Sequence, residues 1–390
     1  MNKHKNPYQL ETLIQHLGEE SKIKRAVVPP LFQNSLFVFD SVEEFRMTSQ
    51  RKLPSDHVYS RVSNPTLELL EQKLAALEGT ERCKLVGSGM SAIAATILAC
   101  VQSGSHVVTL DTAYGPVRDL LENYLPKFGV SHTLVDGTCE EEIFDAIQYN
   151  TTLVYLESPT SIVFRLQNLN AIAAHCKAKG IKTAIDNTYA TPLYQNPAQY
   201  GIDYVIHSCT KYIGGHSDVV AGAVCCSEEL LQPICAHEVA HITSALSPFN
   251  AWLLTRGLRT LPIRLKHHQE SAQTVASWLE DQDWVRQVNH LGLPSFSQKA
   301  LFQEQMQGST GLFSFIPKIQ TEEAIHSFVN ELSIFGRGVS WGGFESLVVP
   351  VLVQASYLPE PTYFVRLFVG LESPIDLIHD LECAAKKAFC

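Results

Sequence analysis

The sequence predicts an α/β protein with a mostly parallel central sheet, followed by a smaller α+β domain. Between residues 66 and 207, short apolar segments alternate with helical segments of about ten residues. Strands of a parallel sheet that helices cover on both faces have this pattern. Beyond residue 255 the alternation ends, and a long helical segment leads into mixed helices and strands. We therefore expect two domains, at residues 61–255 and 256–390.

Composition narrows the functional classes. The 390 residues are 45% hydrophobic and 18% charged, which is typical of a globular protein. Thirty basic and forty acidic residues give a net charge of −10, which argues against nucleic acid or an anionic membrane surface as a partner. The longest apolar segment, residues 90–101, is shorter than the roughly 18 residues of a membrane span. Because the first residues are polar and the ten cysteines are irregularly spaced, we expect a cytoplasmic protein with reduced thiols.

The predicted elements follow in order along the chain. Residues 1–60 lack strong periodicity, and we expect them to form an extended arm. Residues 66–78 carry leucines on one helical face and end at Gly79, and a second helix at residues 90–101 follows the turn Gly87-Ser88-Gly89. Further strands are expected at residues 106–110, 130–135, 153–156, 181–185 and 204–207, with helices at 117–128, 140–149 and 169–179. The second domain is expected to hold a helix at 264–279, strands near 312–315 and 364–369, and a last helix capped by Ser373.

Polar residues follow the predicted strands at Asp111, Glu157, Asp186 and Ser208. The carboxyl ends of parallel strands share one edge of a sheet, and ligands bind there. Lys211 lies three residues beyond Ser208. A buried lysine loses its charge readily and can form a Schiff base, although a solvated lysine on a surface loop has equal weight from the spacing alone.

Together with Lys211, six residues complete a chemical pattern. The hydroxyls of Ser208 and Thr210 suit an anion, and Gly89 and Met90 open a helix whose N-terminus attracts phosphate. Asp186 suits a protonated ring nitrogen or, alternatively, caps a helix. Tyr114 can stack on a planar ring or fill the core. A lysine, a carboxylate, an aromatic ring and a phosphate cradle are together what pyridoxal phosphate requires.

Longer motifs carry a resemblance to a known family. The chain is identified as a member of the Cys/Met-metabolism family of pyridoxal-phosphate enzymes, which have the aspartate-aminotransferase fold (fold type I). The resemblance covers nearly the whole length. Its motifs are Tyr59-Ser60-Arg61, Asn64-Pro65-Thr66, Ser88-Gly89-Met90, Glu157-Ser158-Pro159, Asp186-Asn187-Thr188, Ser208 to Lys211, Gly215-His216-Ser217-Asp218, Thr255-Arg256-Gly257-Leu258-Arg259-Thr260-Leu261 and Ser340-Trp341-Gly342-Gly343-Phe344-Glu345-Ser346-Leu347.

The resemblance implies a role for each matching residue. Lys211 matches the Schiff-base lysine, Asp186 the partner of the pyridine nitrogen, and Tyr114 the tyrosine that stacks on the ring and assists catalysis. The expected phosphate ligands are Gly89, Met90, Ser208 and Thr210, with Tyr59 and Arg61 reaching the phosphate of a neighbouring subunit. Shared sites imply an obligate dimer, usually paired into a tetramer. The substrate-binding residues are expected to be Arg366, which grips the α-carboxylate, with Ser340 and Trp341.

Within the family, the chain most resembles bacterial cystathionine β-lyases. Trp341 stands where γ-acting relatives usually have leucine, and Val339, Ser161 and Pro116 also differ from γ-acting enzymes. Two departures exist: β-lyases often have tyrosine at the Val339 position, and Ser247-Pro248-Phe249 resembles γ-enzymes. The resemblance implies cleavage of cystathionine, a small amino-acid thioether, to homocysteine, pyruvate and ammonia. Cystathionine γ-lyase, γ-synthase and broad cysteine-S-conjugate β-lyase chemistry are the alternatives.

One motif favours a different class of protein. His237-Glu238-Val239-Ala240-His241 fits a zinc-protease pattern of two histidine ligands and a general-base glutamate, with Glu270 as a possible third ligand. The further glycine and histidine of the extended motif are missing, and we expect an ordinary helix and no bound metal.

Overall fold

The computed structural model describes residues 8–20, 22–51 and 56–389. Its larger sheet has the strand order β1-β7-β6-β5-β4-β2-β3. The bounds are β1 Arg82–Val86, β2 His106–Leu110, β3 Ser131–Val135, β4 Thr151–Glu157, β5 Lys182–Asp186, β6 Tyr204–His207 and β7 Gly222–Cys226. All neighbours are parallel except β7, which is antiparallel to β1 and β6. The predicted mostly parallel sheet is confirmed.

Strands β1 and β7 have no counterpart among the predicted strands. Lys84 interrupts the apolar pattern of β1, and its side chain is buried. Its Nζ donates to the carbonyl of Val62 at 2.6 Å and to Glu71 at 2.9 Å. Strand β7 consists of small residues around two cysteines. Neither segment has the continuous run of large apolar side chains by which a buried strand is recognised in a sequence.

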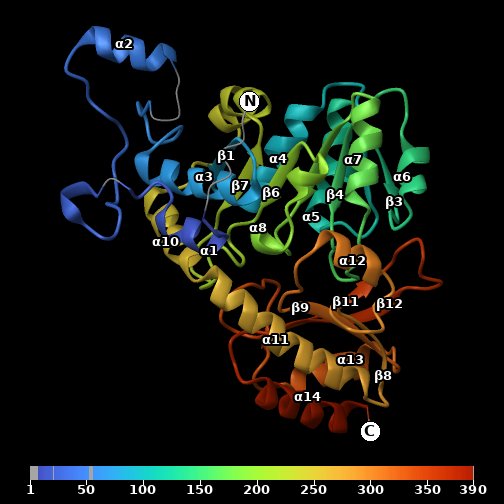
Figure 1. The fold of residues 1–390 in the computed structure, drawn as a ribbon. Helices are drawn as coiled ribbons and strands as arrows, with labels where there is room; N and C mark the ends of the chain where they lie inside the picture. The colour runs from blue at the N-terminus through green and yellow to red at the C-terminus, as the bar shows by residue number, and fades with distance from the viewer. Residues whose placement is uncertain (1–7, 21, 52–55, 390) are drawn as a thin grey trace.

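Helices cover both faces of this sheet (Figure 1). The bounds in this part of the chain are α3 Pro65–Glu78, α4 Gly89–Cys100, α5 Gly115–Asp119, α6 Glu140–Ala146, α7 Leu169–Ala178, α8 Thr191–Tyr194 and α9 Glu228–Ile234. One core joins α3 and α7 to Ile185 and Val205, and the other joins α4 to Ala184 and Ile206. Because alternate strand residues enter opposite cores, the face on which each residue at a strand end lies is fixed.

Local signals explain where two of these helices begin and end. Helix α3 is capped by Asn64 and ends at Gly79, whose φ of 70° is left-handed. Helix α4 is capped by the Ser88 hydroxyl, which accepts from the Ser91 amide at 3.0 Å. The helix expected at 117–128 is instead α5 followed by a wide turn at Leu120–Tyr124 and a tight turn at Leu125–Phe128. Pro126 has no amide hydrogen with which to continue a regular helix.

The C-terminal part is a second layer of sheet and helices. Its strand order is β10-β11-β12-β9-β8, antiparallel except for the pair β10 and β11. The strands are β8 Val285–Asn289, β9 Leu312–Pro317, β10 Gly336–Arg337, β11 Leu347–Val353 and β12 Thr362–Phe368. The helices that follow in the chain are α11 Leu261–Glu280, α12 Lys299–Gln305, α13 Glu322–Glu331 and α14 Pro374–Ala388, and the preceding helix, α10 Pro248–Arg259, packs on α3. Helix α10 includes residue 255, so the predicted limit between the two domains falls inside a helix. The domain limits stay a prediction.

The segment expected to be an extended arm contains helices α1 Leu10–His16 and α2 Val42–Arg51. Helix α1 buries Leu13 and Ile14, and the ammonium of Lys73 on α3 donates to the Ile14 carbonyl at 2.8 Å. Helix α2 lies away from the body of the chain (Figure 1). Apolar side chains between the two helices are exposed, including Val27 and Val38. Across the described ranges, no helix has the length and apolar character needed to cross a membrane.

Candidate active site

Lys211 lies at the carboxyl end of the larger sheet, just beyond β6. Its Nζ donates to the Ser340 hydroxyl at 2.7 Å and lies 5.5 Å from the centre of the Trp341 ring. Burial, followed by the nearby charge of Arg366, lowers the pKa of Lys211 to about 8. The predicted Lys211, Ser340 and Trp341 therefore lie together, although they come from different domains.

Glycine is required where this second-domain loop meets the lysine. Gly342 has a left-handed φ of 87°, and a Cβ there would lie 2.8 Å from the carbonyl carbon of Lys211. Beyond it, both carboxylate oxygens of Glu345 accept from the Ser217 hydroxyl, at 2.7 and 2.8 Å. Glu345 and Ser217 belong to motifs quoted above but were assigned no role. Their hydrogen bond fastens the loop beside Lys211.

Asp186 and Glu157 end adjacent strands and are register partners. Asp186 accepts from the amide of Thr188 at 2.9 Å and from the Thr188 hydroxyl, and burial raises its pKa. Burial, with a smaller contribution from Asp186, raises the pKa of Glu157 to about 8. Glu157 accepts from the Tyr114 amide and the Ser161 hydroxyl, both at 2.6 Å. Glu157 thus fixes the backbone of Tyr114 beside Asp186.

Tyr114 is 44% exposed. Burial of part of the side chain, and then the charges of Asp186 and Glu157, raise the phenol pKa, while Arg366 opposes the shift. These charges come from both domains. The phenol therefore lies at the opening between the charged ends of the larger sheet and strand β12.

Arg366 is on β12, and its Nη2 donates to the carbonyls of Val339 at 2.5 Å and Ser340 at 3.3 Å. Burial lowers its pKa to about 10. Within the described ranges, no carboxylate forms an ion pair with this guanidinium. A half-buried cation that is held only by carbonyl oxygens is suited to bind an external carboxylate.

The predicted phosphate residues converge at the start of α4. A Cβ on Gly89 would lie 2.7 Å from the Cβ of Ser208, so glycine permits close approach of the two segments. The Ser208 amide donates to the Thr188 hydroxyl at 2.7 Å, and the Thr210 hydroxyl accepts from the Ala221 amide at 3.0 Å. Ser88 caps only the Ser91 amide, which leaves the Gly89 and Met90 amides at the helix N-terminus for an anion.

Tyr59 and Arg61 make their contacts away from this group of residues. The Arg61 guanidinium donates to the Ala240 carbonyl at 2.6 Å and lies 5.8 Å from the centre of the Tyr59 ring. Both side chains are exposed. Their expected role at a neighbouring subunit stays a prediction.

The zinc alternative has no cluster to support it. His237 and His241 are exposed, and Glu270 lies 4.0 Å from the ammonium of Lys266. In the part of the chain that the structure describes, no three His, Cys, Asp or Glu side chains are placed to hold a metal ion.

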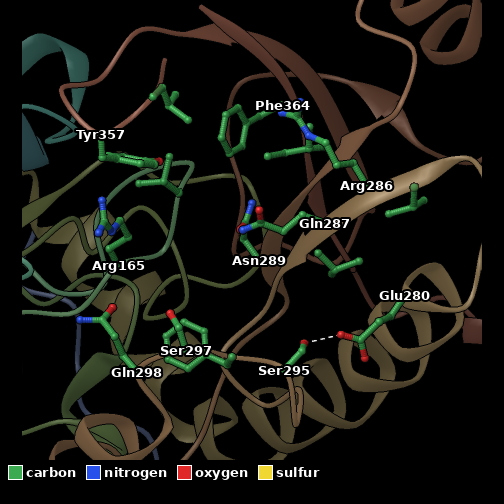
Figure 2. Close-up of a pocket in the computed structure, with 16 residues that line it drawn as sticks. Arg165, Glu280, Arg286, Gln287, Asn289, Ser295, Ser297, Gln298, Tyr357 and Phe364 are labelled. Atoms are coloured by element: carbon green, nitrogen blue, oxygen red, sulfur yellow. Dashed lines mark hydrogen bonds between the residues drawn. The ribbon is translucent and has the colours of Figure 1, made fainter. Parts of the chain in front are cut away.

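A separate cavity of about 410 Å³ lies between the domain of the larger sheet and the C-terminal domain. Figure 2 shows Arg165, Tyr357, Gln298 and Asn289 around it. Arg165 Nη1 lies 2.8 Å from a carboxylate oxygen of Asp136, and its guanidinium lies 4.0 Å from the centre of the Tyr357 ring. None of the predicted site residues lines this cavity.

The residues at the strand ends fit pyridoxal phosphate. Lys211 has a lowered pKa, as an amine that reacts with an aldehyde requires. Asp186 is a half-buried carboxylate that, among the described residues, accepts hydrogen bonds only from Thr188, so a ring N–H can still bind it. The start of α4 presents a glycine and free amides to a phosphate.

Comparison with known proteins agrees with this fit. The family described as "Cys/Met metabolism PLP-dependent enzyme" matches residues 11–386. The chain is similar to an L-methionine gamma-lyase of Porphyromonas gingivalis, with 38% identity over 94% of each chain. It is also similar to a cystathionine beta-lyase of Lactococcus lactis, with 33% identity over 97% of this chain and 99% of the relative.

A solved structure extends the similarity to the whole fold. The crystal structure of metB from Corynebacterium glutamicum superposes with a TM-score of 0.89 and 30% identity, covering 98% of this chain and 99% of that chain. The predicted fold type is therefore confirmed. With the family match over nearly its full length, the chain belongs to the Cys/Met-metabolism family of pyridoxal-phosphate-dependent enzymes.

Proposed function

We propose that the protein is a carbon–sulfur β-lyase that converts L-cystathionine and water to homocysteine, pyruvate and ammonia. The proposal depends on the contact of the segment Ser340-Trp341-Gly342-Gly343 with Lys211. The Ser340 hydroxyl is hydrogen-bonded to the lysine, the Trp341 ring lies near its ammonium, and Gly342 packs against its backbone. This motif is the one that resembles β-acting members of the family. The similarity to a named cystathionine beta-lyase supports it, and the similarity to a methionine gamma-lyase supports γ-elimination as the alternative.

The chain's own residues divide the work of this reaction. Arg366 binds the substrate α-carboxylate and thereby orients the Cα–H bond. Lys211, as a free amine, takes the proton from Cα. Asp186 holds negative charge against the ring nitrogen of the cofactor, which when bound supplies an electron sink for the negative charge that develops at Cα. Either the phenol of Tyr114 or the ammonium of Lys211, formed when it takes the Cα proton, delivers a proton to the departing sulfur.

The experiment separates the two regiochemistries by their products. Purified protein is supplied with pyridoxal phosphate and L-cystathionine, and the oxo acid and the thiol are identified by mass spectrometry. We expect pyruvate with homocysteine. Formation of 2-oxobutyrate with cysteine would replace β- by γ-elimination. A parallel reaction with L-cystine and a cysteine S-conjugate measures breadth: equal kcat/KM for all three would make cystathionine only one of several substrates.

We also propose that the protein acts as a homo-oligomer in which Tyr59 and Arg61 reach a neighbouring site. Exposed apolar side chains on the N-terminal segment, such as Val27 and Val38, support a partner surface there. Light scattering tests the assembly. Mixing an inactive Lys211→Ala protein with an inactive Arg61→Ala protein tests sharing, because mixed dimers regain one intact site only if the site spans two chains.

A further inference from the structure

A buried histidine and a buried glutamate are in hydrogen-bond contact on the face of the sheet opposite the proposed cofactor site. His207 is the last residue of β6, and Glu78 is the last residue of α3. Their side chains are 1% and 0% exposed, and His207 Nε2 lies 2.5 Å from Glu78 Oε1. The other oxygen, Glu78 Oε2, has no partner within the described ranges. Neither residue is used in the reaction described above.

Asn187 ties this pair to the strand that carries Asp186. Its side-chain amide donates to Glu78 Oε1 and to the Gln195 carbonyl, both at 2.9 Å. Its backbone amide donates to the Ile206 carbonyl at 2.9 Å. Asn187 directly follows Asp186, and His207 directly precedes Ser208. The network therefore joins the ends of β5 and β6 at the points where two cofactor residues emerge.

Asp186 and His207 lie on opposite faces of the sheet but close to each other. Ala184 and Ile206 belong to the core on the α4 side, so Asp186, two residues after Ala184, faces that side. Ile185 and Val205 belong to the opposite core, the side on which His207 meets α3. Only the backbone of two adjacent strands lies between His207 and Asp186.

The position of Glu78 makes a cationic partner favourable. A buried carboxylate at the C-terminal end of a helix faces the negative end of the helix dipole and is costly without a cation. A protonated His207 supplies that cation. Its charge also favours the ionised form of Asp186, which burial disfavours.

We propose that Glu78 and His207 form a positioning pair that holds Asp186 ionised and in register with the ring nitrogen of the cofactor. The proposal rests on the cofactor-binding role proposed for Asp186. It does not depend on whether the reaction is β- or γ-elimination. Glu78 sets the proton on His207, His207 supports the charge of Asp186, and Asn187 keeps the two strand ends aligned.

The test removes the charge of Glu78 but keeps the shape of its side chain. In Glu78→Gln the amide oxygen can still accept from Asn187, but no charge remains to hold the proton on His207. The matched control is His106→Gln. His106 is equally buried in the same sheet, bonded to the hydroxyls of Thr151 at 2.8 Å and Thr133 at 2.9 Å, but lies at the start of its strand, away from the cofactor edge.

The readouts are the dissociation constant of pyridoxal phosphate from the reconstituted protein, the absorbance spectrum of the bound cofactor, and Tm. We expect Glu78→Gln to weaken cofactor binding about tenfold, the effect of losing one favourable charge interaction, and to shift the absorbance band. His106→Gln should lower Tm without either change. Unchanged cofactor binding in Glu78→Gln, or equal weakening in both variants, would overturn the inference.

A second variant distinguishes the proposed effect from misfolding caused by an unpaired buried group. The double change Glu78→Gln with His207→Gln leaves two amides that can hydrogen-bond to each other and no buried charge. It is expected to bind the cofactor as weakly as Glu78→Gln, and wild-type affinity in a folded double variant would also overturn the inference. Failure of the wild-type protein to bind pyridoxal phosphate would instead contradict the cofactor site itself.

Discussion

Two regions at the junction of the domains differ in how their charges are matched. At the first, the carboxyl edge, defined by Lys211, Asp186 and Arg366, each charged group has only uncharged hydrogen-bond partners. At the second, the cavity of Figure 2, the guanidinium of Arg165 faces the carboxylate of Asp136. Within the described residues, neither Lys211 nor Arg366 at the carboxyl edge has a carboxylate in contact, whereas Arg165 does.

The difference between the cavity and the carboxyl edge indicates which structural signal identifies a catalytic site. The cavity of about 410 Å³ is well formed, yet the guanidinium of Arg165 on its wall is already paired with the carboxylate of Asp136. At the carboxyl edge, desolvation without a charge partner in contact shifts the pKa of Lys211 to about 8 and that of Arg366 to about 10. Shifts of this kind, rather than volume, mark catalytic groups. The predictions below test this distinction.

The largest effect is expected from Lys211→Ala. The variant lacks the amine that we propose takes the Cα proton, so turnover should fall by at least about 10³-fold, and the absorbance band of the lysine-bound cofactor should be lost. Steady-state kinetics and an absorbance scan measure both. Retention of the band and of turnover together would remove Lys211 from the reaction.

The lowered pKa of Lys211 predicts a pH dependence for cofactor uptake. Only the neutral amine attacks an aldehyde, so in the cofactor-free protein the reconstitution rate should rise about tenfold per pH unit and level off above about pH 8. Stopped-flow absorbance measures the rate. A midpoint near 10 would mean that burial leaves this lysine unperturbed, and the contrast with the cavity would weaken.

Arg366→Ala tests the unmatched cation at the carboxyl edge. Because the guanidinium binds a carboxylate that is present in both substrate and transition state, KM should rise about ten- to a hundredfold while kcat changes little. Arg366→Lys should recover only part of the loss, since lysine cannot make the bidentate contact. A fall confined to kcat would contradict a binding role.

How far the sequence predicts this edge depends on the residue. Asp186 ends one apolar strand and Lys211 follows another. Because the carboxyl ends of parallel strands lie at the same edge of a sheet, the proximity of the two residues is predictable. The contact between Lys211 and Ser340 spans 129 residues and depends on domain packing. Glu78 looks like an ordinary helix-end residue, because nothing local indicates that a distant histidine covers it. Resemblance to relatives supplied Arg366, which the local sequence alone left unexplained.

A smaller effect is expected where backbone crowding, not charge, holds the edge together. Gly342 and Gly104 have nearly the same left-handed φ, 87° and 89°, but a Cβ would clash only at Gly342. Both changes to alanine should cost about 1–2 kcal/mol of stability from the backbone. Only Gly342→Ala should also displace Lys211 and lower kcat, by about tenfold. Equal kcat in the two variants would show that the loop tolerates the clash.

The smallest effect is expected from Arg165→Ala in the cavity. The variant removes a half-exposed ion pair with Asp136 and a cation–π contact with Tyr357, each worth about 1 kcal/mol or less. A Tm lower by a few degrees and kcat/KM within about twofold of the parent follow. Double substitution with Asp136→Ala should add little, because the partners already depend on each other. A large loss of kcat/KM at unchanged Tm would mean that the cavity acts on the carboxyl edge, and a balanced charge pair would no longer distinguish a structural region from a catalytic one.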